Sequence, residues 1–157
     1  MKYSEATTPY VAGIRASLAS RNGAGVVVRD EAVLDSPTAV ISRIRQGLVI
    51  AEFSALAGWL GSTEDELAPL IGLSRATLHR RKKAGHLEAP ESERLIRVTR
   101  LLARATEVFG SEDSARSWLK RPAMAFAGES PLAFSDTEIG AREVEYLLGR
   151  LEHGVFS

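Results

Sequence analysis

Residues Ser62–Leu87, with the sequence STEDELAPLIGLSRATLHRRKKAGHL, carry the signals that decide the fold. Thr63 and Glu66 have the spacing of a capping box, so a short helix is predicted to begin near Glu64. Pro69 lies inside this helix and lacks a backbone N–H, so the last turn should be weakened and the helix short. The side chains predicted to face the core are those of Leu67, Ala68 and Ile71.

A second helix is predicted from about Arg75 to Ala84, directly after a tight turn. Gly72 permits the left-handed backbone of that turn, and Ser74 is placed to cap the second helix. Leu78 is the one strongly apolar residue of this helix and must point inward, and Gly85 then ends it. Two helices joined by such a turn form the outline of a helix-turn-helix.

The outer face of the second helix is polar and cationic. Because Leu78 points inward, the helix start presents Arg75 and Arg80 outward, at the end that recognition helices insert into the major groove. Either arginine suits a bidentate contact with guanine, and the three cations at 81–83 suit phosphate contacts. A solvated basic face or a purely structural corner is the alternative interpretation. The candidate DNA-binding residues are Ser74, Arg75, Ala76, Thr77, His79, Arg80, Arg81, Lys82 and Lys83.

Composition allows a buried core but gives no overall attraction to nucleic acid. The chain has 157 residues, is 45% hydrophobic and has a formal net charge of zero. DNA contact must therefore come from a local patch, and we expect a homodimer to double it. The charge is uneven, because Arg75–Lys83 holds five cations and no anion, whereas Leu101–Ser157 holds nine acidic and six basic residues. This asymmetry favours a DNA-binding half joined to a half with another task.

The sequence argues against an enzyme. It has no cysteine, and its three histidines, His79, His86 and His153, do not have the spacing of a metal site. The acidic cluster Glu64–Glu66 is explained by its place at a helix N-terminus, and nucleophile elbows or phosphate-binding glycine loops are not found. We expect no cofactor and no metal. No apolar run approaches the length of a membrane span, so we also expect a cytoplasmic protein.

Helical periodicity recurs over most of the chain and predicts an all-α fold. Further helices are expected after Pro37, over Ile50–Leu60, from Pro90 to about Phe109, after Ser111 and from about Thr137. The last of these has Ile139, Val144, Leu147, Leu148 and Leu151 as its expected core residues. Residues 1–36 show no sustained helical period and are interpreted as a partly ordered arm, with a possible short strand at 26–28. The predicted domains are this arm at 1–36, a helix-turn-helix DNA-binding domain at 37–88 and a second domain at 89–157.

The C-terminal half contains a spaced set of aromatic, small and turn-forming residues, namely Phe109, Ala115, Trp118, Leu119, Pro122, Gly128, Pro131, Leu132, Gly140, Val144, Leu148 and Gly154. In this arrangement the chain resembles the Xre/MbcA/ParS family of antitoxins. The resemblance extends from about Leu56 to the end, and the segment LSRATLHRRKKAG is similar to the DNA-binding helix of the family. It implies an Xre-like helix-turn-helix that represses its own operon, followed by a toxin-binding domain at 89–157.

The resemblance also implies the partners, which are operator DNA and the toxin of a bacterial type II toxin–antitoxin pair. The preferred partner is a RES-type, NAD-degrading toxin, bound by an antitoxin homodimer within a larger complex. Some antitoxins need the toxin to bridge two dimers before they hold the operator. The alternative is a dimeric repressor without a toxin, which associates through the apolar stripe of the helix from Pro90 to Phe109.

Apolar residues near the C-terminus suggest where a toxin binds. The loop 123–134 combines aromatic residues with Gly128 and Pro131, and the final helix leads into a short apolar tail with Phe156 as its expected anchor. In the alternative interpretation, the phenylalanines at 126, 134 and 156 close a small core. The candidate toxin-binding residues are Phe126, Pro131, Leu132, Phe134, Arg150, Glu152, Val155, Phe156 and Ser157.

Overall fold

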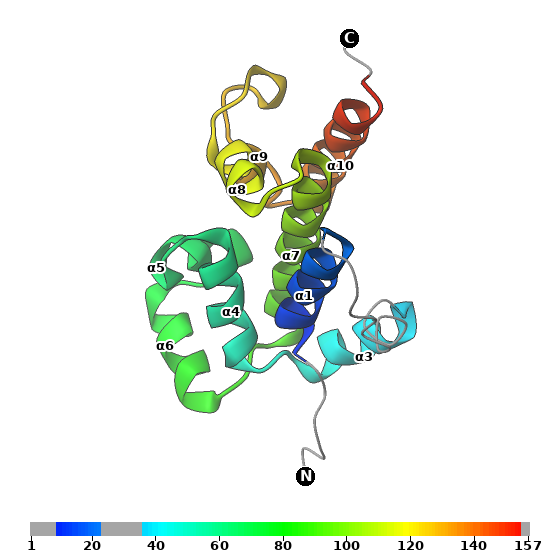
Figure 1. Ribbon diagram of the computed structural model, residues 1–157. Helices are drawn as coiled ribbons and strands as arrows, with labels where there is room; N and C mark the ends of the chain where they lie inside the picture. Colours follow the sequence, from blue (N-terminus) through cyan, green and yellow to red (C-terminus); the bar gives the residue numbers. More distant parts are fainter. Residues whose placement is uncertain (1–8, 23–35, 155–157) are drawn as a thin grey trace.

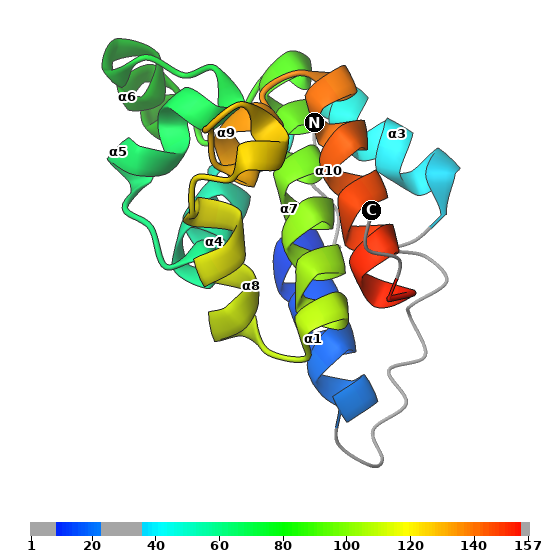
Figure 2. The same cartoon turned by 90° about the horizontal axis from the view of Figure 1, so that it is seen from above.

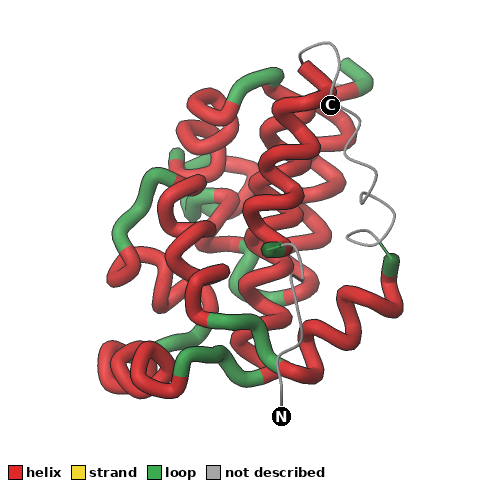
Figure 3. The backbone as a smooth tube through the Cα atoms, turned by 60° about the horizontal axis from the view of Figure 1, so that its bottom comes forward, coloured by secondary structure: helices red, strands yellow, loops and turns green. Residues whose placement is uncertain are grey.

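The structure, a computed structural model, describes residues 9–22 and 36–154. Within these residues the regular elements are all helices, apart from one isolated bridge, which confirms the predicted all-α class (Figure 3). The longest helix, α7 (Ala89–Phe109), runs through the middle of the molecule (Figure 1). The α-helices packed on it are α1 (Tyr10–Asn22), α3 (Pro37–Gln46), α4 (Ile50–Leu60), α8 (Glu112–Lys120) and α10 (Glu138–Glu152).

Helix α7 supplies the centre of the hydrophobic core. Its buried residues include adjacent pairs such as Leu95 and Ile96, so its neighbours cover more than one narrow stripe of the helix. Figure 2 shows α7 between α8 and α10, the two helices of the C-terminal half that pack on it. The apolar stripe predicted for this helix is buried at Leu95, Val98, Leu101, Leu102 and Ala105, whereas its last residue, Phe109, is only partly buried.

The predicted helix-turn-helix is present. The capping box forms as expected, because Thr63 Oγ1 accepts from the Glu66 N–H at 3.2 Å and Glu66 Oε2 accepts from the Thr63 N–H at 2.8 Å. Pro69 shortens the first helix as predicted, since the chain passes from α-helix to 3₁₀-helix just before it. Gly72 then adopts a left-handed φ of +77°. The elements of this unit are α5 (Glu64–Leu67), the 3₁₀-helix η1 (Ala68–Ile71) and α6 (Arg75–Ala84).

A short backbone junction closes the helix-turn-helix at its base. The Leu87 N–H donates to the Leu48 carbonyl at 2.8 Å, and the Ile50 N–H donates to the Gly85 carbonyl at 2.9 Å. Gly47 lies against this junction with φ +82° and ψ 131°. A Cβ at Gly47 would lie 2.1 Å from the Leu87 carbonyl oxygen. The junction therefore requires glycine at this position.

The C-terminal half contains two short helices where a loop was predicted. These are the 3₁₀-helix η2 (Met124–Phe126) and α9 (Pro131–Phe134), and the following helix α10 is capped by Thr137. The prediction that Ile139 faces the core is wrong, since its side chain is 78% exposed. The buried face of α10 instead runs through Ala141, Val144 and Leu148. Ile139 is five residues before Val144, which places it well away from that face.

The N-terminal region differs most from the sequence prediction. Part of the arm predicted at 1–36 is the helix α1, which packs on α4 and α7, so the expectation of no sustained helix is wrong for Tyr10–Asn22. Tyr10 and Val11 are buried, and their backbone N–H groups donate to the carboxylate of buried Glu52 at 2.6 and 2.9 Å. The possible strand at 26–28 lies outside the described residues.

Candidate nucleic-acid interface and partner-binding segments

Helix α6 is placed as the helix-turn-helix pattern predicts. The Ser74 Oγ accepts from the Thr77 N–H at 3.1 Å, which caps the first turn. Leu78 is 5% exposed and anchors the inner face. The side chains at Arg75, Ala76, His79 and Arg80 are exposed, and they form the surface that we call the outer face of α6.

Two cations of α6 are engaged within the protein, which the sequence did not indicate. The Arg81 guanidinium donates from Nε and Nη2 to the Glu91 carboxylate at 2.8 and 2.9 Å, and both side chains are largely buried. Lys82 forms an ion pair with Glu64 of α5. The Arg81 pair therefore fixes α6 against the start of α7.

The electrostatics of this pair are consistent with a structural role. Burial raises the pKa of the Glu91 carboxyl, but hydrogen bonds from the Arg81 guanidinium and the Glu88 N–H lower it more. The net pKa of Glu91 lies below its ordinary value. The same hydrogen bond raises the pKa of Arg81, so both groups stay charged at neutral pH.

The remaining cations of α6 are accessible to a ligand. Arg75 has an 89% exposed side chain, and its Nη2 forms an ion pair at 3.7 Å with Oδ2 of Asp65, which is itself exposed. Arg80 Nη2 donates to the Thr77 hydroxyl at 3.1 Å, a contact within the same helix turn. His79 and Lys83 are exposed and make no hydrogen bond or ion pair within residues 9–22 and 36–154. The outer face of α6 thus offers two arginines and a histidine, with Lys83 nearer the helix end.

The two described aromatic residues predicted for toxin binding, Phe126 and Phe134, do not form an open surface. Phe126 is 3% exposed, and its ring centroid lies 4.9 Å from that of partly buried Phe134. Pro131 and Leu132 are also buried. The alternative interpretation, in which the phenylalanines close a small core, describes Phe126 better than direct contact with a partner.

The end of α10 is partly engaged within the chain. Arg150 is exposed, whereas Glu152 accepts from Arg104 Nη1 of α7 at 3.2 Å. The predicted tail residues Val155, Phe156 and Ser157 lie outside the described residues.

The sequence interpretation missed Met124, which is 94% exposed. The available signal was the absence of any charged residue from 122 to 128.

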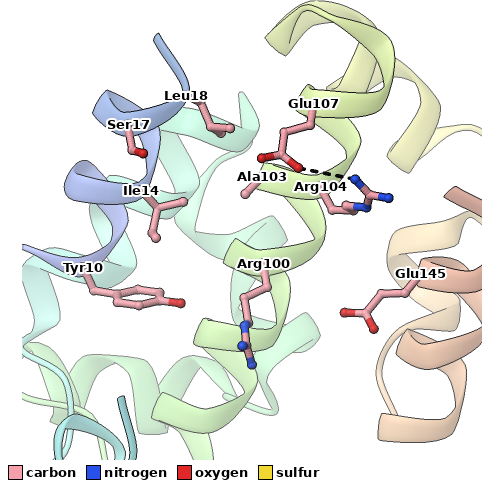
Figure 4. Close-up of a pocket in the computed structure, with 9 residues that line it drawn as sticks. All are labelled: Tyr10, Ile14, Ser17, Leu18, Arg100, Ala103, Arg104, Glu107 and Glu145. Atoms are coloured by element: carbon pink, nitrogen blue, oxygen red, sulfur yellow. Dashed lines mark hydrogen bonds and ion pairs between the residues drawn. The ribbon is translucent and has the colours of Figure 1, made fainter. Parts of the chain in front are cut away.

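A pocket of about 350 Å³ lies between α1, α7 and α10 (Figure 4). Tyr10 and Ile14 of α1 line one side, and Glu145 of α10 lines the other. The ion pair between Arg104 and Glu107 lies between them. The lining of the pocket mixes apolar and charged side chains and includes no histidine. Elsewhere in the described part of the chain, no cluster of metal-ligating side chains occurs either. Nor does any described helix have the length and apolar character of a membrane span.

Two family models match the chain, one on each half. The Antitoxin Xre-like helix-turn-helix domain matches residues 39–100, which include α4, α5 and α6. The Antitoxin Xre/MbcA/ParS C-terminal toxin-binding domain matches residues 104–154, which include α8, α9 and α10. Helix α1 lies outside both matches.

Similar proteins from three bacteria are named Antitoxin Xre. The chain is 34% identical over 122 residues to Antitoxin Xre of Yersinia enterocolitica, covering 76% of this chain and 82% of that protein. It is 31% identical over 116 residues to Antitoxin Xre of Photorhabdus laumondii, covering 73% and 78%. It is 32% identical over 90 residues to Antitoxin Xre of Pseudomonas putida, covering 57% and 54%. With these relatives and both domain matches, the chain belongs to the Xre/MbcA/ParS family of antitoxins.

Proposed function

We propose that this antitoxin binds and inhibits a cognate RES-type, NAD-degrading toxin and represses its own operon through its helix-turn-helix. It does so without catalysis or a cofactor, as a homodimer within a larger toxin–antitoxin complex. Operator binding is carried by one observation: buried Leu78 turns the outer face of α6 to solvent, with Arg75, His79 and Arg80 exposed on it. Arginines at the start of such a helix suit guanine edges in the major groove.

The cations of α6 divide into two roles. Arg75, Arg80 and Lys83 contact DNA, whereas Arg81 positions the helix through Glu91. Lys82 contacts a phosphate only if its ion pair with Glu64 yields. A module with so few free cations on a chain of zero net charge binds weakly alone, which supports operator binding by paired modules.

Toxin inhibition is supported by the match of residues 104–154 to a toxin-binding domain. The choice of a RES-type partner follows from the family resemblance rather than from any single side chain. The test is to co-express the chain with the product of the adjacent gene, purify the complex and measure NAD consumption by the partner with and without it. A stable complex that stops NAD loss supports the proposal. A chain that purifies alone and binds its own promoter favours the repressor without a toxin.

Operator binding is tested by Arg80→Ala. Loss of a bidentate guanine contact should weaken operator binding by about 1–3 kcal/mol and leave toxin neutralisation intact. Arg121→Ala is the matched control, because Arg121 is an exposed arginine in the C-terminal half. Mobility-shift titrations at several salt concentrations measure both variants. Equal losses in both variants would contradict the assignment of the outer face of α6.

A further inference from the structure

The most exposed large hydrophobic side chain of the described residues lies at the tip of the 123–129 loop. Met124 is 94% exposed, and the small residues Ala125, Ala127 and Gly128 beside it are exposed as well. We call these four residues the apolar tip. No charged residue occurs between Arg121 and Glu129, so the surface at this point of the chain is apolar and uncharged.

The backbone of this loop is closed by its own hydrogen bonds. The Ala123 N–H donates to the Glu129 carbonyl at 3.0 Å, and the Gly128 N–H donates to the Ala123 carbonyl at 3.1 Å. Two successive left-handed residues make the turn, with φ +55° at Ala127 and +86° at Gly128. Left-handed backbone at an alanine is uncommon and persists where surrounding contacts hold it. The apolar tip therefore has a defined shape before any partner binds.

The loop is anchored to the protein by Phe126, whose side chain is buried while that of Met124 is exposed. Phe126 is 3% exposed and packs on Phe134 of α9, so the 3₁₀-turn η2 buries one side chain and presents Met124 on its far side. A fixed loop loses little conformational freedom on binding, which lowers the cost of association. Methionine also adapts its unbranched side chain to an irregular apolar pocket.

We propose that the apolar tip is the anchor by which this chain docks, with Met124 entering an apolar pocket on the cognate toxin. This inference rests on the proposed function, since it names the surface that holds the toxin. The tip lies within residues 104–154, the part that matches a toxin-binding domain. Its four residues carry no cation for a phosphate, which favours the toxin over DNA as the occupant.

The test compares substitutions at Met124 in the full-length chain. The affinity for the purified product of the adjacent gene is measured by calorimetry for Met124→Asp, Met124→Ala and Met124→Leu. A charge forced into an apolar pocket should weaken binding about thirty-fold or more, the effect of a hot-spot substitution. Truncation to alanine should have a smaller effect in the same direction, and leucine should restore most of the affinity.

The matched control is Ile41→Asp, which adds the same charge to a 45% exposed aliphatic residue in α3 of the helix-turn-helix half. It should change toxin affinity by no more than about two-fold. Operator binding and the thermal midpoint should be unchanged in every Met124 variant, which shows that the fold is intact. The anchor is overturned if Met124→Asp binds as tightly as wild type, or if only Ile139→Asp on α10 weakens binding. A wild-type chain that does not bind the toxin overturns the proposed function itself.

Discussion

The helix-turn-helix and helix α1 are held in place by contacts of different range. In the helix-turn-helix, Thr63 and Ser74 each cap a helix by accepting from an N–H three residues ahead. Helix α1 is held instead by Glu52, whose carboxylate accepts the Tyr10 and Val11 N–H groups from 42 and 41 residues away. Local contacts can be recognised as short sequence patterns, and distant contacts cannot. The difference explains why the first region was predicted closely and the second was not.

The largest expected effect is at the base of the helix-turn-helix, where Gly47 lies against the backbone carbonyl of Leu87, a residue distant in the sequence. Gly47→Ala places a Cβ 2.1 Å from the Leu87 carbonyl oxygen, at a φ and ψ that favour only glycine. We expect a loss of about 3 kcal/mol or more in the free energy of unfolding. Urea denaturation followed by circular dichroism measures the change.

Gly85→Ala is the matched control for this prediction. Gly85 also has a left-handed φ, at +85°, but a Cβ there would meet nothing within 4 Å. Only backbone strain remains, which costs about 1–2 kcal/mol. Similar losses in the two variants would mean that the junction is not close-packed at Leu87.

The next effect tests whether α1 depends on its distant partner. Glu52→Gln replaces one carboxylate oxygen with an amide N–H₂ that faces a backbone donor, since Tyr10 and Val11 both donate to this side chain. An unsatisfied buried group costs about 1–3 kcal/mol. Amide hydrogen exchange should accelerate in α1 and change little in α6.

The matched control is Glu66→Gln in the capping box of α5. Glutamine retains an oxygen that accepts from the Thr63 N–H, so the local cap should survive with little loss of stability. Unchanged exchange in α1 of the Glu52→Gln variant would contradict the idea that Glu52 holds this helix.

Particular residues show where sequence reasoning succeeded and where it stopped. The caps at Thr63 and Ser74 and the break at Pro69 were predicted because each signal lies within three or four residues of its effect. The inward position assigned to Ile139 was wrong because Ile139 lies five residues before Val144 and so points well away from the face that Val144 and Leu148 bury. The partner of Arg81 was missed because a basic run does not show which cation meets a carboxylate on another helix.

In the candidate site, the DNA-binding face could be predicted from the sequence, whereas the exposed residue of the 123–134 segment could not. The outer face of α6 was predicted from Leu78, a single apolar residue whose burial fixes the rest of the helix. The 123–134 segment has no regular period, so nothing in the sequence distinguished buried Phe126 from exposed Met124. The residues assigned to DNA and toxin binding stay predictions until the Arg80 and Met124 variants are measured.

The smallest expected effect compares a distant ion pair with a local one. Arg15 of α1 donates to Glu112 of α8 at 2.8 Å from both Nε and Nη2, 97 residues apart, whereas Arg142 pairs with Glu138 one turn away in α10. The Arg15 hydrogen bond lowers the pKa of Glu112 more than burial raises it. Because the side chains are 43% and 33% exposed, solvent screening limits the pair to about 0.2–1 kcal/mol.

The lowered pKa fixes the sign of the pH dependence. A carboxyl whose pKa is lower in the folded state stabilises the protein above its unfolded pKa of about 4.3, and this contribution is lost as pH falls through the folded pKa. Arg15→Gln should therefore be less stable than wild type at pH 7, with a difference that shrinks as the pH falls below about 4. Arg142→Gln should have the smaller effect at pH 7, since it breaks an exposed i,i+4 pair. Urea midpoints across this pH range measure both variants. A difference for Arg15→Gln that grows on acidification would contradict the Glu112 assignment and remove this pair from the contacts that hold α1.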